Sequence, residues 1–368
     1  MPFPPTQPPG LGLSLGGSVL SYRGPLLDFD DALFRRPNEG SYLIDLSGTV
    51  GWQAANLRRE GYDFGELLTL LEGQRTNLAI SSETFSGWAA TAGAVVTAAG
   101  ATAPDGAADA YDIFTNATNS RVMSTITLGA SILTTLSRWV KNNIGDGSSR
   151  LQLVQKDGAT TVDLASTATS TWAREALRAA STSTGGSNPQ FWHRGSASAG
   201  SRNIYTWGAQ LELGRYETSY IRTAGGTVER EADQLTWAPN EVPQQLREKA
   251  SKLRVGAWHA NTDLASGDVR VIYSFNGGAD LLRLRHDGSS VLLEAVAGGA
   301  VKASKAATYA RRTAFDVWVD PVVGRVAVGG VWGSTGTPWT WPAGHFRLGG
   351  ELGGINEFDG GCSIPETL

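Results

Sequence analysis

The stretch YTWGAQLELGRYETSYIRTAGGTVEREAD, residues 205–233, decides the fold class of this chain. In its first half apolar and polar side chains alternate, which is the two-residue period of a β-strand. The period predicts which side chains face a core and which face away from it: Trp207, Leu211 and Leu213 inward, and Gln210 and Glu212 outward. A turn and a second strand end follow. The stretch contains no nucleophile motif, phosphate-binding loop or metal-ligand cluster.

The same alternation recurs along most of the chain. Short alternating segments run from residue 76 to about 235 and again from residue 255 onward, separated by turn sequences such as PDG, GDG and KDG. The 46 glycines and a charged fraction of only 18% favour short strands and tight turns over long helices. At 368 residues the chain exceeds the size of one hydrophobic core. We therefore predict an all-β protein of two antiparallel β-sandwiches after an extended N-terminal segment.

Three segments depart from this pattern. Residues 239–254 carry apolar side chains every three to four positions, which predicts a short helical connector between the sandwiches. Residues 171–181, TWAREALRAAS, have a locally helical composition that conflicts with the strands around them. Residues 66–74 suit either a helical turn or a buried strand. Elsewhere, Asp287-Gly288 between two alternating runs predicts a β-hairpin, and VWVDPVVGRVAVGG predicts another.

Charge and cysteine content exclude several classes of protein. The chain has 31 basic and 35 acidic residues without a block of like charge, which argues against nucleic-acid binding. A single cysteine, Cys362, excludes an intramolecular disulfide framework and a cysteine-based zinc site. The N-terminus lacks the features of a signal peptide, and no apolar run reaches the roughly 18 residues of a membrane span. We expect folding in a reducing cytoplasm and no membrane insertion.

Chemistry-bearing motifs are nearly absent, so we predict no enzyme and no cofactor. The four histidines are scattered through the sequence and form no metal-binding motif. Pairs of carboxylates suffice for glycoside hydrolysis, and the available acids include Asp28, Asp30, Glu217 and Glu231. Nothing singles these four out. Asp105 and Asp109, in APDGAADAY, either bind a structural calcium ion or belong to a plain turn.

The aromatic residues are more informative about binding, because twelve tryptophans is a high number for this length. Several aromatic residues fall beside glycine and proline in expected loops, where flat rings can stack on sugars. These candidate glycan-binding residues are Phe191, Trp192, Trp332, Trp339 and Trp341. The alternative is that they fill gaps in the fold or in a subunit interface. Proline-dense residues near the N-terminus suit docking onto another protein, with Pro4, Pro5, Pro8 and Pro9 as candidate anchors.

Four motifs together resemble a family of tailed-bacteriophage and prophage virion proteins that comprises fibres, head spikes and minor structural proteins. In order they are EGQRTNLAISSETFSGWA, APDGAADAY, LSRWVKNN and the opening stretch with its WGAQLE, TSYI and final arginine and aspartate. The resemblance covers about residues 26–235 and implies a jelly roll similar to carbohydrate-binding modules. The C-terminal part more loosely resembles a concanavalin-type, lectin-like sandwich, through YARRTAFDVWVDPVVGRVAV and TPWTWPAGHFRLGGELGG.

These observations divide the chain into five parts. We expect a Pro/Gly-rich anchor or tail at 1–25, an irregular β leader at 26–75, the jelly roll at 76–238, the helical connector at 239–254 and the lectin-like sandwich at 255–368. Two departures from the family pattern matter. Arg222 stands where the family has a proline, and the chain stops at CSIPETL, before the last strand expected of such a sandwich. An edge left open, or filled by a neighbouring subunit, would favour an oligomer.

The resemblance implies a virion fibre or spike, assembled in the host cytoplasm and exposed on the particle. We expect a homotrimer that contacts other virion proteins through its N-terminus and binds host cell-surface polysaccharide by weak, multivalent contacts. Three alternatives stay open. They are a purely structural decoration or adaptor protein of the virion, a polysaccharide depolymerase, and a secreted bacterial carbohydrate-binding protein.

Overall fold

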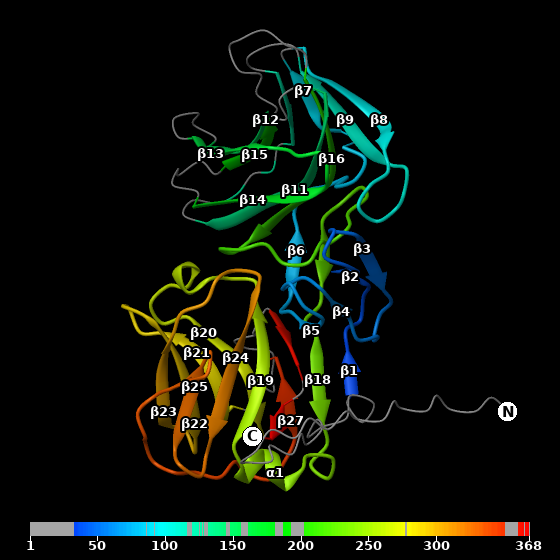
Figure 1. Ribbon diagram of the computed structural model, residues 1–368. Coiled ribbons are helices and arrows are strands. Elements are labelled where there is room, and N and C mark those ends of the chain that lie inside the picture. Colours follow the sequence, from blue (N-terminus) through cyan, green and yellow to red (C-terminus); the bar gives the residue numbers. More distant parts are fainter. Residues whose placement is uncertain are drawn as a thin grey trace, which may run out of the picture.

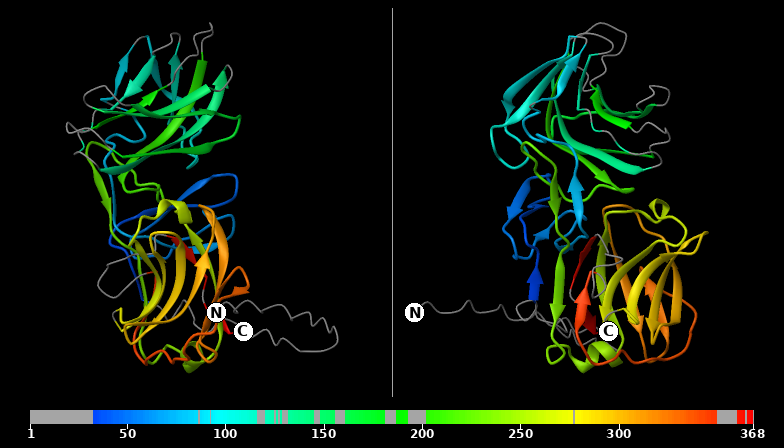
Figure 2. Two further views of the ribbon diagram at one scale, coloured as in Figure 1. Left: turned by 90° about the vertical axis from the view of Figure 1, so that its left-hand side faces the viewer. Right: turned by 180° about the vertical axis from the view of Figure 1, so that it is seen from behind.

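The computed structural model describes residues 33–367, except 86, 92, 116–119, 125, 127, 129–131, 145–147, 156–160, 181–186, 193–201, 277, 350–359 and 364. The predicted anchor residues Pro4, Pro5, Pro8 and Pro9, and the acids Asp28 and Asp30, lie outside the described residues. The described chain is almost entirely β-structure, and its strands pair antiparallel in two sandwiches. The predicted fold class is therefore confirmed. Figures 1 and 2 show the two sandwiches end to end, with the leader strands beside their junction.

The first sandwich packs two five-stranded sheets, β14-β11-β16-β9-β8 and β13-β12-β15-β10-β7, against each other (Figure 1). Its strands are β7 Ala89–Thr91, β8 Val95–Ala101, β9 Ala110–Thr115, β10 Arg121–Met123, β11 Leu133–Ile144, β12 Ser148–Gln155, β13 Thr161–Thr167, β14 Ala173–Ala180, β15 Ser187–Trp192 and β16 Arg202–Leu213. The chain crosses repeatedly from one sheet to the other. Ile113, Val122, Leu136 and Leu151 contribute to the core between the sheets.

Strand β16 carries the first half of the opening stretch. The prediction is confirmed for Leu211, which is fully buried in the core between the sheets. Trp207 is also fully buried, but it lies in a separate cluster with Trp139 and Tyr220, because the register of β16 against β11 shifts between Trp207 and Gln210. The prediction is wrong for Leu213, which lies at the strand end and is 49% exposed. Gln210 and Glu212 lie on the opposite face from Leu211, as predicted, yet both are fully buried.

The reason is that residues 215–223 fold back over the second face of β16. Gln210 Oε1 accepts a hydrogen bond from Ile221 N at 2.6 Å, and Glu212 Oε2 accepts one from Thr218 N at 3.0 Å. Buried polar groups are tolerable when they are hydrogen-bonded in this way. Strand alternation alone does not reveal such a cover, since the covering segment has no regular period of its own.

The second sandwich is assembled from both ends of the described chain. Its seven-stranded sheet has the order β1-β18-β27-β20-β21-β22-β23, and its eight-stranded sheet joins β26-β25-β24-β19-β28-β5-β4 with β29 beside β19. The C-terminal elements are α1 Gln244–Glu248, β19 Ser251–Ala257, η1 Asn261–Asp263, β20 Val269–Phe275, β21 Asp280–His286, β22 Val291–Ala297, β23 Ala300–Ala307, β24 Thr313–Asp320, β25 Arg325–Val328, β26 Val331–Trp332, β27 Phe346–Leu348, β28 Gly360–Cys362 and β29 Glu366–Thr367.

The predicted leader is not simply a linker, because β1, β4 and β5 belong to this second sandwich, whereas β2 and β3 pair with each other and β6 pairs with β17. The strands of the N-terminal part are β1 Leu33–Arg35, β2 Gly40–Leu43, β3 Val50–Gln53, β4 Glu60–Gly61, β5 Leu68–Leu71 and β6 Arg75–Asn77. The two strands that follow the first sandwich are β17 Val228–Arg230 and β18 Gln234–Trp237. Strand β5 pairs with β28, and β1 pairs with β18, which the predicted boundary at residue 238 had placed in the jelly roll. Of the two alternatives for residues 66–74, a helical turn or a buried strand, the strand is correct, because all four residues of β5 are buried.

Local composition misleads at the two expected helices. The connector forms a helix only at Gln244–Glu248, and β19 begins at Ser251. Residues 171–181 contain strand β14, paired along its whole length with β11. Tertiary pairing overrides weak helix propensity here. Both predicted hairpins are confirmed, as β21 pairs with β22 around Asp287 and β24 pairs with β25.

The C-terminus closes a sheet and leaves no gap for a neighbour at that place. Strand β28 lies between β19 and β5, with Cys362 opposite Val255 on one side and Thr69 on the other. The expectation of an open or subunit-filled last edge is therefore wrong at this place, because β28 of the chain itself lies there. Cys362 is fully buried, and burial raises the pKa of its thiol.

Candidate functional site

The end of the opening stretch contributes to a buried charge cluster, not to a binding site. This cluster consists of Arg36, Arg59, Glu72, Arg230 and Asp233, whose side chains are at most 1% exposed. Arg59 contacts Glu72 at 2.8 Å, Arg230 contacts Glu72 at 3.1 Å, and Arg36 contacts Asp233 at 3.3 Å. Arg59 also pairs with Asp233. The cluster ties the leader to the segment that closes the first sandwich.

Glu72 is held ionised at the centre of the cluster. Burial opposes its negative charge, but Arg230, Arg59 and the hydrogen bonds from Ser219 outweigh burial and lower the pKa of Glu72 to about 2. Ser219 belongs to the TSYI motif, and its backbone N donates to Glu72 at 2.8 Å. These motif residues therefore fix the junction of the two sandwiches.

A second set of motif residues forms the floor beneath a surface groove. Trp207 contacts Tyr220 with ring centroids 4.8 Å apart and Trp139 at 5.4 Å. Val50 and Ala103 belong to the same buried cluster. Trp172 packs against the outside of this cluster and is only partly buried. The opening stretch thus supports the groove from below without reaching its surface.

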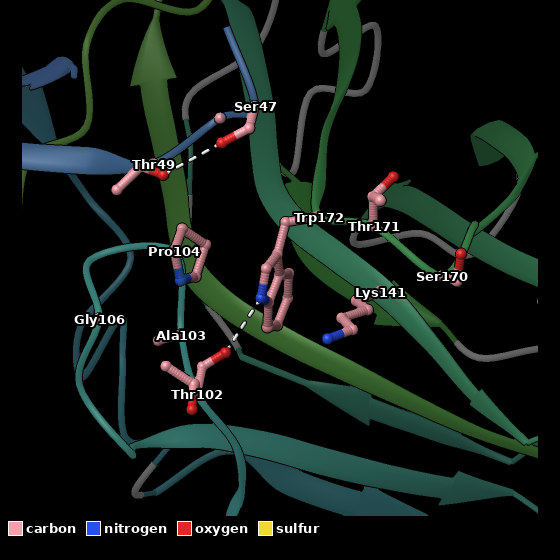
Figure 3. Close-up of a pocket in the computed structure, with 11 residues that line it drawn as sticks. Ser47, Thr49, Thr102, Ala103, Pro104, Gly106, Lys141, Ser170, Thr171 and Trp172 are labelled. Carbon is pink, nitrogen blue, oxygen red and sulfur yellow. Dashed lines mark hydrogen bonds between the residues drawn. The ribbon is translucent and has the colours of Figure 1, made fainter. Parts of the chain in front are cut away.

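The groove has a volume of about 440 Å³ and is open to solvent. Four stretches that are distant in sequence form it, and the residues that line it are Ser47, Gly48, Thr49, Thr102, Ala103, Pro104, Gly106, Lys141, Ser170, Thr171 and Trp172. Figure 3 shows Trp172 in the middle of the groove, between Pro104 and Lys141. The lining therefore combines one large aromatic ring, several hydroxyl groups and one ammonium group.

Trp172 is held in a fixed orientation. Its indole Nε1 donates a hydrogen bond to Thr102 O at 3.0 Å, which Figure 3 marks with a dashed line. Gly48, in the β2–β3 turn, has a φ of +91°. A Cβ at this glycine would lie 3.8 Å from Trp172 O, so the turn lies close to the backbone of Trp172. A partly exposed ring that is locked in place loses little entropy when a ligand stacks on it.

The loops around Trp172 are tied together by main-chain hydrogen bonds. Val50 N donates to Pro104 O at 2.9 Å, and Asn142 N donates to Thr169 O at 2.7 Å. In the described part of the chain, the exposed hydroxyls of Thr102 and Ser170 have no intramolecular hydrogen bond, so they are available to a ligand. The groove is preformed, which is typical of ligand sites.

Arg222 lies beside the groove, in contact with Asp105, which stands between two residues that line it. Its guanidinium stands 4.2 Å from the centroid of the Trp52 ring. It also contacts Glu83 at 2.9 Å and Asp105 at 3.3 Å. Trp52 lies in β3, just after the turn that supplies Ser47 and Thr49, and Asp105 lies in the β8–β9 loop. The arginine therefore connects the two segments that form one wall of the groove.

Of the two interpretations of Asp105 and Asp109, a calcium site or a plain turn, the contacts of Asp105 favour the turn. Asp105 Oδ1 accepts a hydrogen bond from Ala107 N at 3.1 Å, and its other oxygen faces Arg222. Burial and the charge of Asp105 raise the pKa of Asp109. Among the described residues, no group of three or more His, Cys, Asp or Glu side chains is arranged to hold a metal ion.

Two of the predicted glycan-binding tryptophans are core residues. Trp341 is 1% exposed and stacks on Phe275 at 5.5 Å, and Trp339 is 9% exposed. A segment that we call the strap, residues 333–341, carries them into the second sandwich. The strap is fastened by main-chain hydrogen bonds from Gly336 N to Gly324 O at 2.6 Å and from Thr337 N to Lys302 O at 3.2 Å. For these two residues the gap-filling alternative is the correct one.

The other three aromatic candidates are not in loops. Trp332 is partly buried in β26, with Arg325 at 4.1 Å from its ring and Trp318 at 5.5 Å. Phe191 and Trp192 end strand β15, where Phe191 pairs with Leu151, and their side chains lie outside the described part of the structure. The five candidates are not brought together in one site.

The acids considered for glycosidase chemistry are also dispersed. Glu217 is buried and paired with Arg178 at 2.6 Å, next to the junction of the sandwiches. Glu231 lies just after β17, where its backbone N donates to Asn38 at 3.3 Å. The structure brings neither of them to the groove.

Trp172 was missed because its segment looked helical. The other walls of the groove are too far away in sequence to be associated with it.

We compared the chain with known proteins. No model of a known family matches it, and no curated protein matches it. Among solved structures, the chain is similar to the N-terminal CBM22-1-CBM22-2 tandem domain of Xyn10C from Paenibacillus barcinonensis, with 12% identity over 80% of this chain and 98% of that chain and a TM-score of 0.31. At this TM-score the likeness decides neither fold nor function. The described residues contain no helix with the length and hydrophobicity of a membrane span.

Proposed function

We propose that this chain is a non-catalytic structural component of a tailed-phage virion that binds host surface polysaccharide through the Trp172 groove. It acts from the particle surface as a homotrimer, held by other virion proteins at its N-terminus. The motif resemblance over about residues 26–235 supports the virion part. The tryptophan of the groove, with its surrounding hydroxyls, is the single observation that supports the glycan part.

The physical basis is a match between the groove and a sugar ring. The apolar C–H face of a sugar stacks on an indole, and its hydroxyls exchange hydrogen bonds with serine and threonine. Thr102 and Ser170 stand on either side of Trp172 in Figure 3. The groove is shallow and open, so a single contact is weak and several copies on one particle are needed for firm adsorption.

Binding of purified protein to envelope polysaccharides of the host, measured by calorimetry, tests the glycan part. We expect Trp172→Ala to weaken binding by about 2 kcal/mol, because it removes the central aromatic contact. The matched control is Trp332→Ala, which removes a partly buried tryptophan from the second sandwich and should leave the affinity unchanged. The reverse result would move the site to the second sandwich.

Two further measurements test the rest of the proposal. Antibody labelling should decorate phage particles, and soluble protein should compete with phage for cells. Labelled particles without competition or polysaccharide binding would support the purely structural alternative. Release of reducing ends from the bound polysaccharide would support the depolymerase alternative.

A further inference from the structure

Lys141 is the one ionisable side chain among the described residues that line the Trp172 groove. It lies in β11 opposite Tyr205. The preceding residue, Val140, is buried in a small core with Ile204, so alternation turns Lys141 to the other face. Figure 3 shows its side chain beside Trp172, with the amine directed into the groove.

The ammonium group of Lys141 has no ion pair or hydrogen bond within the described part of the chain, although its side chain is partly buried. The acids on the neighbouring loops are already engaged. Asp45 accepts hydrogen bonds from the backbone N of Ser47 and of Thr49, at 2.9 and 3.2 Å. Asp105 faces Arg222. A partly desolvated cation without a partner, beside a stacking surface, is an incomplete ion pair.

We propose that the groove selects a sugar unit that carries a negative charge, a uronic acid carboxylate or a phosphate substituent, and that Lys141 binds this group. The inference rests on the glycan-binding function proposed above. The whole chain has a net charge of −4 and therefore repels acidic polymers in general. A preference for an acidic glycan must then come from a local cation, and Lys141 is placed to supply it while Trp172 stacks on the ring.

The test compares an acidic polymer with a neutral polymer of the same backbone, and a third polymer carries phosphate. The full chain is titrated with polygalacturonate, with carboxyl-reduced polygalacturonate, and with a glycerol-phosphate teichoic acid as the phosphate arm. We expect wild-type protein to bind at least one acidic polymer about tenfold more tightly than the neutral one, the typical effect of one charge-assisted hydrogen bond at a partly exposed site. This preference should fall as NaCl is raised, because salt screens the contact.

Lys141→Gln should bring the acidic-to-neutral ratio of Kd values to about one, while Lys141→Arg should retain the preference. Lys249→Gln removes the same charge from an exposed position after α1 and should change nothing. Far-UV circular dichroism and thermal unfolding confirm that each variant is folded. An unchanged ratio in folded Lys141→Gln would overturn the inference and leave the proposed function intact. If wild-type protein binds neither acidic nor neutral polymers, both proposals fail.

Discussion

The strap and the Trp172 groove are both tryptophan-bearing segments rich in small polar residues, yet they do opposite things. The strap buries Trp339 and Trp341 in the second sandwich, whereas the groove leaves Trp172 partly exposed. The difference lies in the main chain. The backbone amides of the strap donate hydrogen bonds to carbonyls of β23 and of the turns around β25, which hold the segment across the sandwich. Trp172, in contrast, is fixed by a hydrogen bond from its own indole to Thr102. A loop tryptophan is therefore a binding candidate when its ring is fixed beside a groove, and a core residue when its main chain is bonded across a sheet.

The largest expected effect comes from removing the Trp341 ring at the end of the strap. Trp341→Ala should destabilise the second sandwich by about 3–5 kcal/mol, because it removes a fully buried ring and leaves a cavity. Urea unfolding followed by tryptophan fluorescence measures the loss. Trp341→Phe should keep much of the stability, and Trp172→Ala should cost far less than Trp341→Ala. Equal losses at the two tryptophans would break the comparison.

The next largest effect is expected from low pH, which should disturb the groove before it disturbs the strap. The pKa of Glu72 is lowered from its usual 4.5 to about 2 in the fold, so its contribution to stability is present above about pH 5 and is lost as the pH falls towards 2. A shift of this size corresponds to about 3 kcal/mol. Because Arg59 of the cluster donates to Ser41 O in β2, we expect acid to loosen the hairpin that supplies Ser47 and Thr49 to the groove.

The measurement is polysaccharide binding and urea stability at pH 7, 5 and 3. Glu72→Gln should lower stability at pH 7 by about 3–5 kcal/mol, since it leaves buried arginines underpaired, and should flatten the pH dependence. The strap contains no member of the cluster, so the burial of Trp341 should persist until global unfolding. A wild-type protein whose stability does not change between pH 5 and 3 would contradict this assignment.

The contrast also explains what the sequence could and could not predict. The Asp287-Gly288 hairpin and the inward side of β16 follow from turn chemistry and alternation, which are local. The burial of Glu212 depends on Thr218 folding back over the outer face of the strand. The groove depends on four stretches, from Ser47 to Trp172, that only the tertiary fold brings together. Local patterns thus predicted the strands, and non-local contacts determined the site.

A smaller effect should follow from crowding the strap. A Cβ at Gly336 would lie 2.1 Å from Lys302 O, so Gly336→Ala must push the strap away from β23. We expect a loss of about 1–3 kcal/mol, in the range for overpacking. Gly225→Ala is the matched control, because no atom lies within 4 Å of its Cβ position, and it should stay within about 0.5 kcal/mol of wild type. Binding in the groove should not change in either variant, and a loss of binding in Gly336→Ala would mean that the two regions are coupled.

The smallest effect tests whether Arg222 serves the groove as its position suggests. Arg222→Pro restores the residue of the resembling virion proteins and removes the contacts to Trp52, Glu83 and Asp105. Because the arginine is 41% exposed, the loss of stability should be only about 0.5–1 kcal/mol. Arg222→Lys keeps the charge without the flat guanidinium and should lie between wild type and the proline variant. Polysaccharide affinity should weaken in the same order, since Trp52 in β3 and Asp105 in the β8–β9 loop lie close to residues that line the groove. An affinity that is indifferent to both substitutions would mean that these segments hold their positions through the hydrogen bond from Val50 N to Pro104 O alone.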